Sequence, residues 1–226
     1  MKTEDCKQFI IDALRSLQGI TFLQNTPEQR ITVSFLRKML FSAQAVLNLG
    51  NDGYDACIIA SHMVEGVLLL NWLLDDTNRI KDYEDYSIIE MLAVLTVDSS
   101  QKNLLLNEIK KRNIQRFLNP KKIKDNKNVS DDVLLNQENY YDRWYKPDIN
   151  SLNHISRKLK FKESQEAVQK IHDIYHELCA YKHFAPTVMP SPNNTTDEWA
   201  IKPLNSAMMA TMHCLHLTLL YTRQFQ

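Results

Sequence analysis

The sequence predicts an all-α protein, a multi-helix bundle built around one buried central helix. Only 4 of the 226 residues are glycine and 44% are hydrophobic, so the chain can bury a sizeable core as a single domain over 1–226. Apolar residues recur three and four positions apart in several stretches, which is the period of a helix with one buried face. The stretch 55–75 is apolar on almost every side, as expected of a helix that other helices surround.

The first half of the chain predicts five helices in order. The first covers about 4–18. The second begins after Thr26, because Thr26 to Gln29 forms a capping box with a proline at the first helical position. The central helix 55–75 follows. A second capping-box pattern, Ser87 to Glu90, predicts a short helix to about Val97, and a further helix runs from about 100 to 117.

The second half is less regular. Pro120 and the polar run after it predict an irregular or mobile insertion over 119–150, with a short helix near 130–139. An aromatic turn at 140–145 is expected to pack onto the core as a lid. Helices are then predicted at 151–160 and 162–183, a proline- and asparagine-rich loop at 185–200, and a final apolar helix at 206–221.

Charge and cysteine content restrict the function classes. The 27 basic and 27 acidic side chains cancel, so no overall field attracts nucleic acid or an anionic membrane. The cysteines are far apart and lie in helical patterns, which is typical of reduced, buried thiols in a cytoplasmic protein. The N-terminal residues are acidic where a signal peptide would be apolar. We therefore expect a cytoplasmic protein with no membrane association and no cofactor.

Glu65 is the main functional clue within the central helix. Burying a lone carboxylate costs several kcal/mol, so Glu65 is expected to be protonated, paired or directed into a polar cavity. Ser61, His62 and Asn71 are the other polar residues in this apolar stretch.

Histidines offer a second interpretation, metal-dependent chemistry. His172 and His176 lie on one side of the predicted helix 162–183, at the edge of its apolar face, and His213 and His216 are three apart in the last helix. Spaced imidazoles on facing helices can bind a metal. The chain contains no H-E-x-x-H or E-x-x-H motif and few acids in apolar helices, so we assign no metal site.

A basic run between 110 and 127 is a candidate for binding nucleic acid. Dense lysine and arginine can hold phosphates by releasing counterions, although a solvated helix face is the stronger interpretation in a neutral chain. The candidate residues are Lys110, Lys111, Arg112, Arg116, Lys121 and Lys122.

Two motifs resemble the signatures of an uncharacterised prokaryotic helical family, a domain of unknown function. The first is Ala60 to Glu65, running on to Asp76, and the second is Tyr175 to His183, with the pattern Tyr-x-x-Leu-(Ser/Cys)-x-(aromatic)-x-His. The family commonly has an arginine four residues before the glutamate, where this chain has Ser61.

That resemblance implies a bundle similar to the HEPN superfamily, whose members often form dimers and often act as ribonucleases in toxin–antitoxin and antiviral-defence systems. Their active motif is an arginine followed by a histidine after four to six residues. None of the seven histidines here has an arginine at that distance. The resemblance therefore implies the fold and the setting, and leaves enzymatic activity open.

From these observations we expect a cytoplasmic helical-bundle component that binds or regulates within a prokaryotic stress or defence system. Its expected site is a polar pocket of Glu65, His62, Tyr175 and His183, and its expected partners are a second copy of the chain and a protein from the same operon. Two alternatives remain. One is a metal-independent ribonuclease that holds RNA on the basic run, and the other is a metal-dependent enzyme that uses the spaced histidines.

Overall fold

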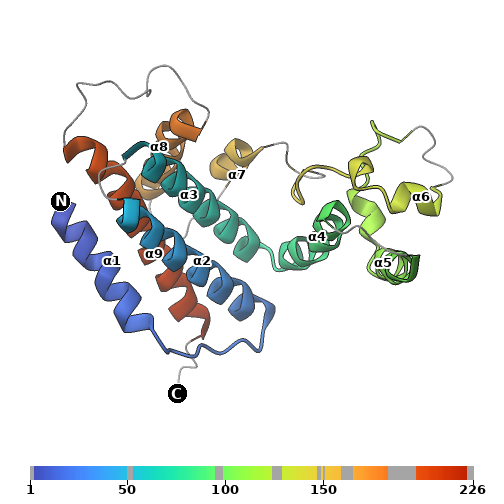
Figure 1. Ribbon diagram of the computed structural model, residues 1–226, viewed down its shortest axis with the longest axis horizontal. Coiled ribbons are helices and arrows are strands. Elements are labelled where there is room, and N and C mark those ends of the chain that lie inside the picture. The colour runs from blue at the N-terminus through green and yellow to red at the C-terminus, as the bar shows by residue number, and fades with distance from the viewer. Residues whose placement is uncertain are drawn as a thin grey trace. The chain divides into compact units, whose positions relative to one another are not determined.

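The computed structural model describes residues 3–49, 53–94, 99–123, 129–146, 149, 151–158, 165–182 and 197–222. In chain order the elements are α1 (Thr3–Leu17), α2 (Pro27–Leu49), α3 (Gly53–Asp75), α4 (Asn78–Val94), α5 (Ser99–Lys111), η1 (Ile114–Phe117), α6 (Asp131–Leu134), η2 (Gln137–Asn139), α7 (Leu152–Lys158), α8 (Gln165–Lys182) and α9 (Asp197–Thr222). These residues form no strand and only one isolated bridge, between Leu118 and Tyr140. The all-α class and the multi-helix bundle are confirmed (Figure 1).

Contacts group the chain into two compact units, whereas the sequence predicted one domain over 1–226. The first unit combines 1–75 with 155–226, and the second is 76–154. The physical reason lies in where the apolar helices occur. The longest apolar helices come from the two ends of the chain and pack together, while the middle segment buries a small core of its own.

In the first unit, α3 and α9 share the central position. Helix α3 packs against α2, α8 and α9, and α9 packs against α1, α2 and α3 (Figure 1). Helix α3 buries residues on several sides of its axis, including Cys57, Ala60, Val64, Leu68 and Leu73. The prediction of a buried helix at 55–75 is thus confirmed, with a second helix beside it in the core.

Helix α3 is also the one helix in the described residues that is long and apolar enough to cross a membrane. Within its most apolar window, 56% of the residues are buried by the rest of the protein. A core helix of a soluble bundle passes the same test of length and composition, so this finding is compatible with a soluble protein.

Helix α2 begins as its sequence predicts. The Thr26 hydroxyl accepts a hydrogen bond from the Gln29 amide at 3.3 Å, and the Gln29 side chain accepts from the Thr26 amide at 3.2 Å. This reciprocal pair is the capping box, with Pro27 at the first helical position. Because both orphan amides find acceptors, the helix start is fixed locally.

The second unit is held by aromatic side chains and an ion-pair network. Trp144 is 8% exposed and meets the rings of Tyr83 and Tyr145 edge-on at 5.7 and 5.6 Å. Tyr140 is 1% exposed and donates its hydroxyl hydrogen to the Leu134 carbonyl at 2.8 Å. The aromatic turn at 140–145 therefore packs into a core, as predicted. Burial raises the Tyr140 pKa to about 12.

The described part of the insertion predicted at 119–150 is irregular, although hydrogen bonds between backbone groups join its beginning to its later part. Asn119 donates to the Asn139 carbonyl at 2.9 Å, and Tyr141 donates to Phe117 at 3.0 Å. The predicted helix at 130–139 is split into α6 and η2, and the Ser130 hydroxyl caps α6 through the Val133 amide at 3.4 Å. Residues 124–128 lie outside the described residues.

Two predicted helix starts are wrong. Ser87 lies in the middle of α4, where its hydroxyl donates to the Glu84 carbonyl at 2.6 Å and caps nothing. Helix α4 instead begins after Asp76, whose carboxylate accepts from the Asn78 amide at 3.0 Å. The last helix was predicted to begin at 206, but α9 begins at Asp197 and includes Pro203.

Helix α9 continues through Pro203, so it begins upstream of the predicted start. Pro203 removes one backbone donor, but its side chain is buried in the first unit, so packing outweighs the lost hydrogen bond. Within the loop predicted at 185–200, residues 197–200 are therefore helical, and 185–196 lie outside the described residues.

Candidate functional site

Glu65 finds its partner on its own helix. Its side chain is 14% exposed, and one carboxylate oxygen lies 3.3 Å from Nδ1 of His62, one turn earlier in α3. His62 is 56% exposed, so this pair reaches the surface. Of the three alternatives expected for Glu65, which were a protonated, a paired or a cavity-facing carboxylate, this contact corresponds to the paired one.

The other members of the predicted polar pocket have different placements. Tyr175 lies on α8, which packs against α3, and it is 8% exposed with its ring 5.7 Å from that of His176. His183 lies outside the described residues. The grouping of Glu65, Tyr175 and His183 into one pocket therefore stays a prediction.

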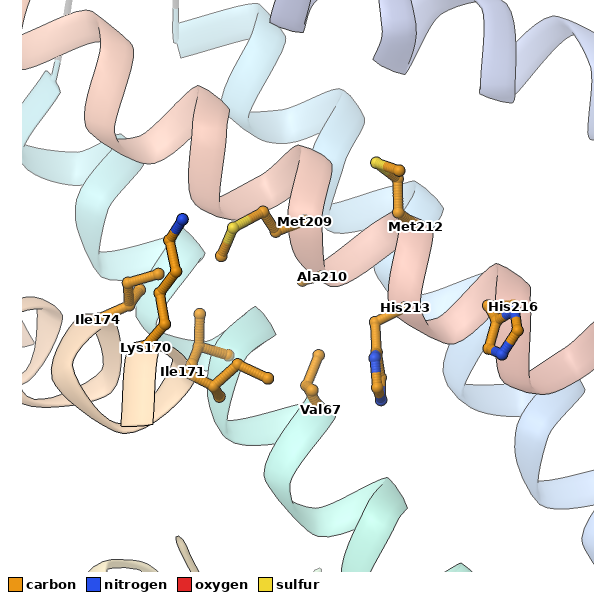
Figure 2. A pocket seen from close by; sticks show the side chains of 10 residues that line it. Val67, Lys170, Ile171, Ile174, Met209, Ala210, Met212, His213 and His216 are labelled. Atoms are coloured by element: carbon orange, nitrogen blue, oxygen red, sulfur yellow. The ribbon is translucent and has the colours of Figure 1, made fainter. Parts of the chain in front are cut away.

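A cavity of about 410 Å³ lies between α3, α8 and α9. Most of its wall is aliphatic or thioether (Figure 2). The lining residues are Val64, Val67, Lys170, Ile171, Ile174, Met209, Ala210, Met212, His213 and His216. Its size and apolar wall are typical of small-molecule sites, which commonly enclose about 300–1,000 Å³.

Asn71 on α3 and His213 on α9 form a polar contact beside the cavity. The Asn71 amide nitrogen donates to the Val67 carbonyl at 2.8 Å and lies 2.7 Å from Nε2 of His213. Because that nitrogen is a donor, Nε2 must accept, and the neutral ring carries its hydrogen on Nδ1. The contact therefore fixes both the tautomer and the direction of the ring, which points from α9 toward α3 in Figure 2.

The remaining polar groups stand at the edge of the cavity. Lys170 extends from α8 toward α9, and its side chain is exposed (Figure 2). His216 follows His213 by one turn of α9 and is exposed. Met212 is 48% exposed and points away from the other labelled side chains. The cavity thus has an apolar interior and a rim of nitrogen bases.

Helices α8 and α9 are also joined by an ion pair. The Lys202 ammonium on α9 hydrogen-bonds to the Glu177 carboxylate on α8, and this bond raises the Lys202 pKa. On α3, burial raises the pKa of the Cys57 thiol to about 12. The four cysteines are free thiols. Three of them are buried as the sequence predicted, whereas Cys179 is only half-buried.

Most of the candidate cationic side chains in the basic run form ion pairs with acidic side chains of the second unit. Lys110 lies 2.7 Å from Asp131, and Arg112 lies 2.8 Å from Glu108. Arg116 donates to Asp82 at 2.7 Å and to the nearly buried Asp85 at 2.8 Å.

Lys111 lies 3.7 Å from Glu108, and the Lys122 ammonium donates to the Tyr140 carbonyl at 3.1 Å. Lys121 is exposed. Cations already held by carboxylates gain less from contact with phosphates, because those pairs must first be broken. RNA binding by this run stays a prediction.

The spaced histidines do not assemble into a larger group among the residues that the structure describes. Nε2 of His172 and Nε2 of His176 are 3.2 Å apart, so one imidazole donates to the other. In the described part of the chain, no three histidine, cysteine or acidic side chains come together in a way that could hold a metal.

Comparisons with known proteins return no match. Protein-family models, curated proteins and solved structures were each searched, and none matches this chain. The resemblance to the HEPN superfamily therefore stays a prediction that rests on the two motifs.

Sequence reasoning missed the cavity but noticed two of its signals. Asn71 interrupts an apolar helix, and His213 does the same in the last helix, where polar residues are expected to have partners. What could not be read from the sequence is that these two side chains, 142 positions apart, meet each other.

Proposed function

We propose that this protein is a binding component that holds a small, mainly apolar molecule between α3, α8 and α9, and that occupancy regulates a partner. The setting, a prokaryotic stress or defence system, rests on the resemblance of the two motifs. Cytoplasmic location and association as a homodimer or with a partner from the same operon belong to the same proposal.

One observation carries the proposal, namely the cavity of about 410 Å³ whose wall is almost entirely apolar. Val67 and Ala210 are both buried within the first unit, so the floor of the cavity belongs to the packed core. An apolar molecule that enters such a space removes its own surface from water and restores contacts that the wall residues lack.

The lining side chains favour binding over hydrolysis. Among those that the structure describes, none carries a hydroxyl, thiol or carboxylate that could act as a nucleophile. The Nε2 lone pair of His213 is already used to accept from Asn71.

A binding experiment with 1-octanol tests the proposal. We expect saturable one-site binding by isothermal titration calorimetry, with a negative heat-capacity change because apolar surface is buried. Ile171→Trp fills part of the cavity from its α8 side and should abolish the binding signal. Ile171 is only half-buried, so the larger side chain can be accommodated without unfolding the bundle.

The control is Ile20→Trp, the same chemical change at a position that is 48% exposed and outside the cavity. It should bind 1-octanol as the native protein does. If the native protein shows no saturable binding, or if Ile171→Trp binds as well as Ile20→Trp, the cavity is not a ligand site and the proposal fails.

A further inference from the structure

We infer that the ligand of this cavity is an aliphatic monocarboxylate, with its chain against the apolar wall and its carboxylate at the rim formed by Lys170, His213 and His216. The inference rests on the proposed function and adds the chemical class of the ligand. It follows from the charge of Lys170 at the rim, the tautomer of His213 and the apolar composition of the wall.

Charge complementarity is the first argument. Every polar side chain lining the cavity in the described residues is a nitrogen base, and no carboxylate is among them. Lys170 is the fully charged member of this group, and no negative charge among the described lining residues opposes it. A ligand with a negative head group meets attraction there, whereas a cationic one meets repulsion.

Lys170 supplies the full positive charge. Its aliphatic stem lies beside Ile171 and Ile174, its ammonium group reaches toward α9, and the side chain is exposed (Figure 2). This arrangement lets the stem add to the apolar wall while the charged end stays hydrated until an anion binds. One ammonium group matches one negative charge, which favours a monoanion.

His213 lines the cavity in a defined tautomer. Because its Nε2 accepts from Asn71, the hydrogen of the neutral ring is on Nδ1. Since Asn71 already uses the Nε2 lone pair, the ring offers a ligand no acceptor at that atom, which disfavours a hydrogen-bond donor as the head group.

The apolar wall disfavours a ligand whose main part is polar. The branched side chains of Val64, Val67, Ile171 and Ile174, with the thioether of Met209, offer no hydrogen-bonding partner to a sugar or a nucleotide base. Polar groups left unpaired in such a space would keep the full penalty of their lost hydration. An alkyl chain loses nothing of this kind and gains from every buried methylene.

A comparison of octanoate with 1-octanol tests the inference, since the two differ only in the head group. We expect the native protein to bind octanoate about tenfold more tightly than 1-octanol at pH 7, a difference of about 1.4 kcal/mol. Raising the salt concentration from about 0.05 M to about 1 M should weaken octanoate and leave 1-octanol unchanged, because the ionic contact lies at the exposed rim.

Lys170→Gln removes the charge and should reduce octanoate affinity to the level of 1-octanol without changing 1-octanol binding. Lys170→Arg keeps the charge and should retain most of the preference. The matched control is Lys38→Gln, which makes the same change in net charge at an exposed position of α2 that is not part of the cavity. This control should behave as the native protein does.

The two levels of the proposal fail in different ways. If 1-octanol binds and octanoate binds no more tightly, or if Lys170→Gln and Lys38→Gln weaken octanoate equally, the inference about the head group is wrong and the apolar site remains. If neither molecule binds, the inference and the proposed function are both wrong.

Discussion

Arg116 in the second unit offers a direct test of whether the basic run is structural. Its guanidinium donates to Asp82 at 3.0 and 2.7 Å, to Asp85 at 2.8 Å and to the carbonyls of Arg112 and Asn113 at 2.9 and 2.8 Å. Replacing it by methionine keeps most of the side-chain volume and removes the charge and all of these bonds.

The magnitude follows from the exposure of the two acids. Asp85 is 4% exposed in its side chain, so losing Arg116 leaves a nearly buried charge, for which about 3–5 kcal/mol is typical. Arg112, at 3.6 Å from Asp85, offers partial compensation and places the expected loss near about 3 kcal/mol. Asp82 is 33% exposed, and solvent screening makes its share small.

Hydrogen exchange measured by mass spectrometry is the suitable assay, because it reports each unit separately. Arg116→Met should speed exchange in peptides from α4 and α5 and leave α3 protected. Adding Asp85→Asn should recover about 1–2 kcal/mol, because the buried charge is then gone. Arg37→Met, at an exposed position of α2, is the matched control and should change neither unit. A loss below about 1 kcal/mol for Arg116→Met would refute the reasoning, since that is the value of an exposed pair.

Four further predictions concern the α2 cap, a buried hydroxyl and the thiols. Thr26→Ala should lower the free energy of unfolding by about 1 kcal/mol in a urea titration, because the α2 capping box loses its acceptor, and an unchanged midpoint would contradict this. Tyr140→Phe should cost about 1 kcal/mol, since the Leu134 carbonyl loses a buried donor, and a stability equal to that of the native protein would argue against that bond. Burial raises the pKa of Cys57 and Cys214 to about 12 from an ordinary 9.0, and unfolding returns it, so stability should fall as the pH rises from 9.0 toward 12. At pH 8 iodoacetamide should label Cys179 first, and equal labelling of Cys57 would show that its thiol is accessible.

Local chemistry explains which helices could be predicted. The α2 start was correct because all the groups of its cap lie within four residues of one another, so no distant part of the chain is needed. The same pattern at Ser87 misled, because a capping box in sequence is equally compatible with a helix interior when the helix has already begun upstream. The continuation of α9 through Pro203 could not be predicted either, because the lost hydrogen bond is local whereas the burial that compensates for it depends on the tertiary structure.

In the candidate site, too, a contact within one helix could be expected from the sequence, whereas a contact between helices could not. The sequence indicated that Glu65 needs a partner, and His62 supplies one from the same helix. It also marked Asn71 and His213 as polar residues in apolar helices, but their contact joins α3 to α9. Since a periodicity specifies which face of a helix is buried and not what lies against it, pairings across the bundle could not be derived.

By itself, then, the sequence determined the all-α class and the burial of the 55–75 helix, because hydrophobic period and composition are properties of the chain alone. Only the tertiary structure decided that the ends of the chain form one unit and the middle another, that the basic run is paired with acids, and that an apolar cavity with a basic rim lies between α3, α8 and α9. The reason is physical: a cavity and an ion pair are relations between side chains that the fold brings together, and their geometry does not exist until those helices have packed.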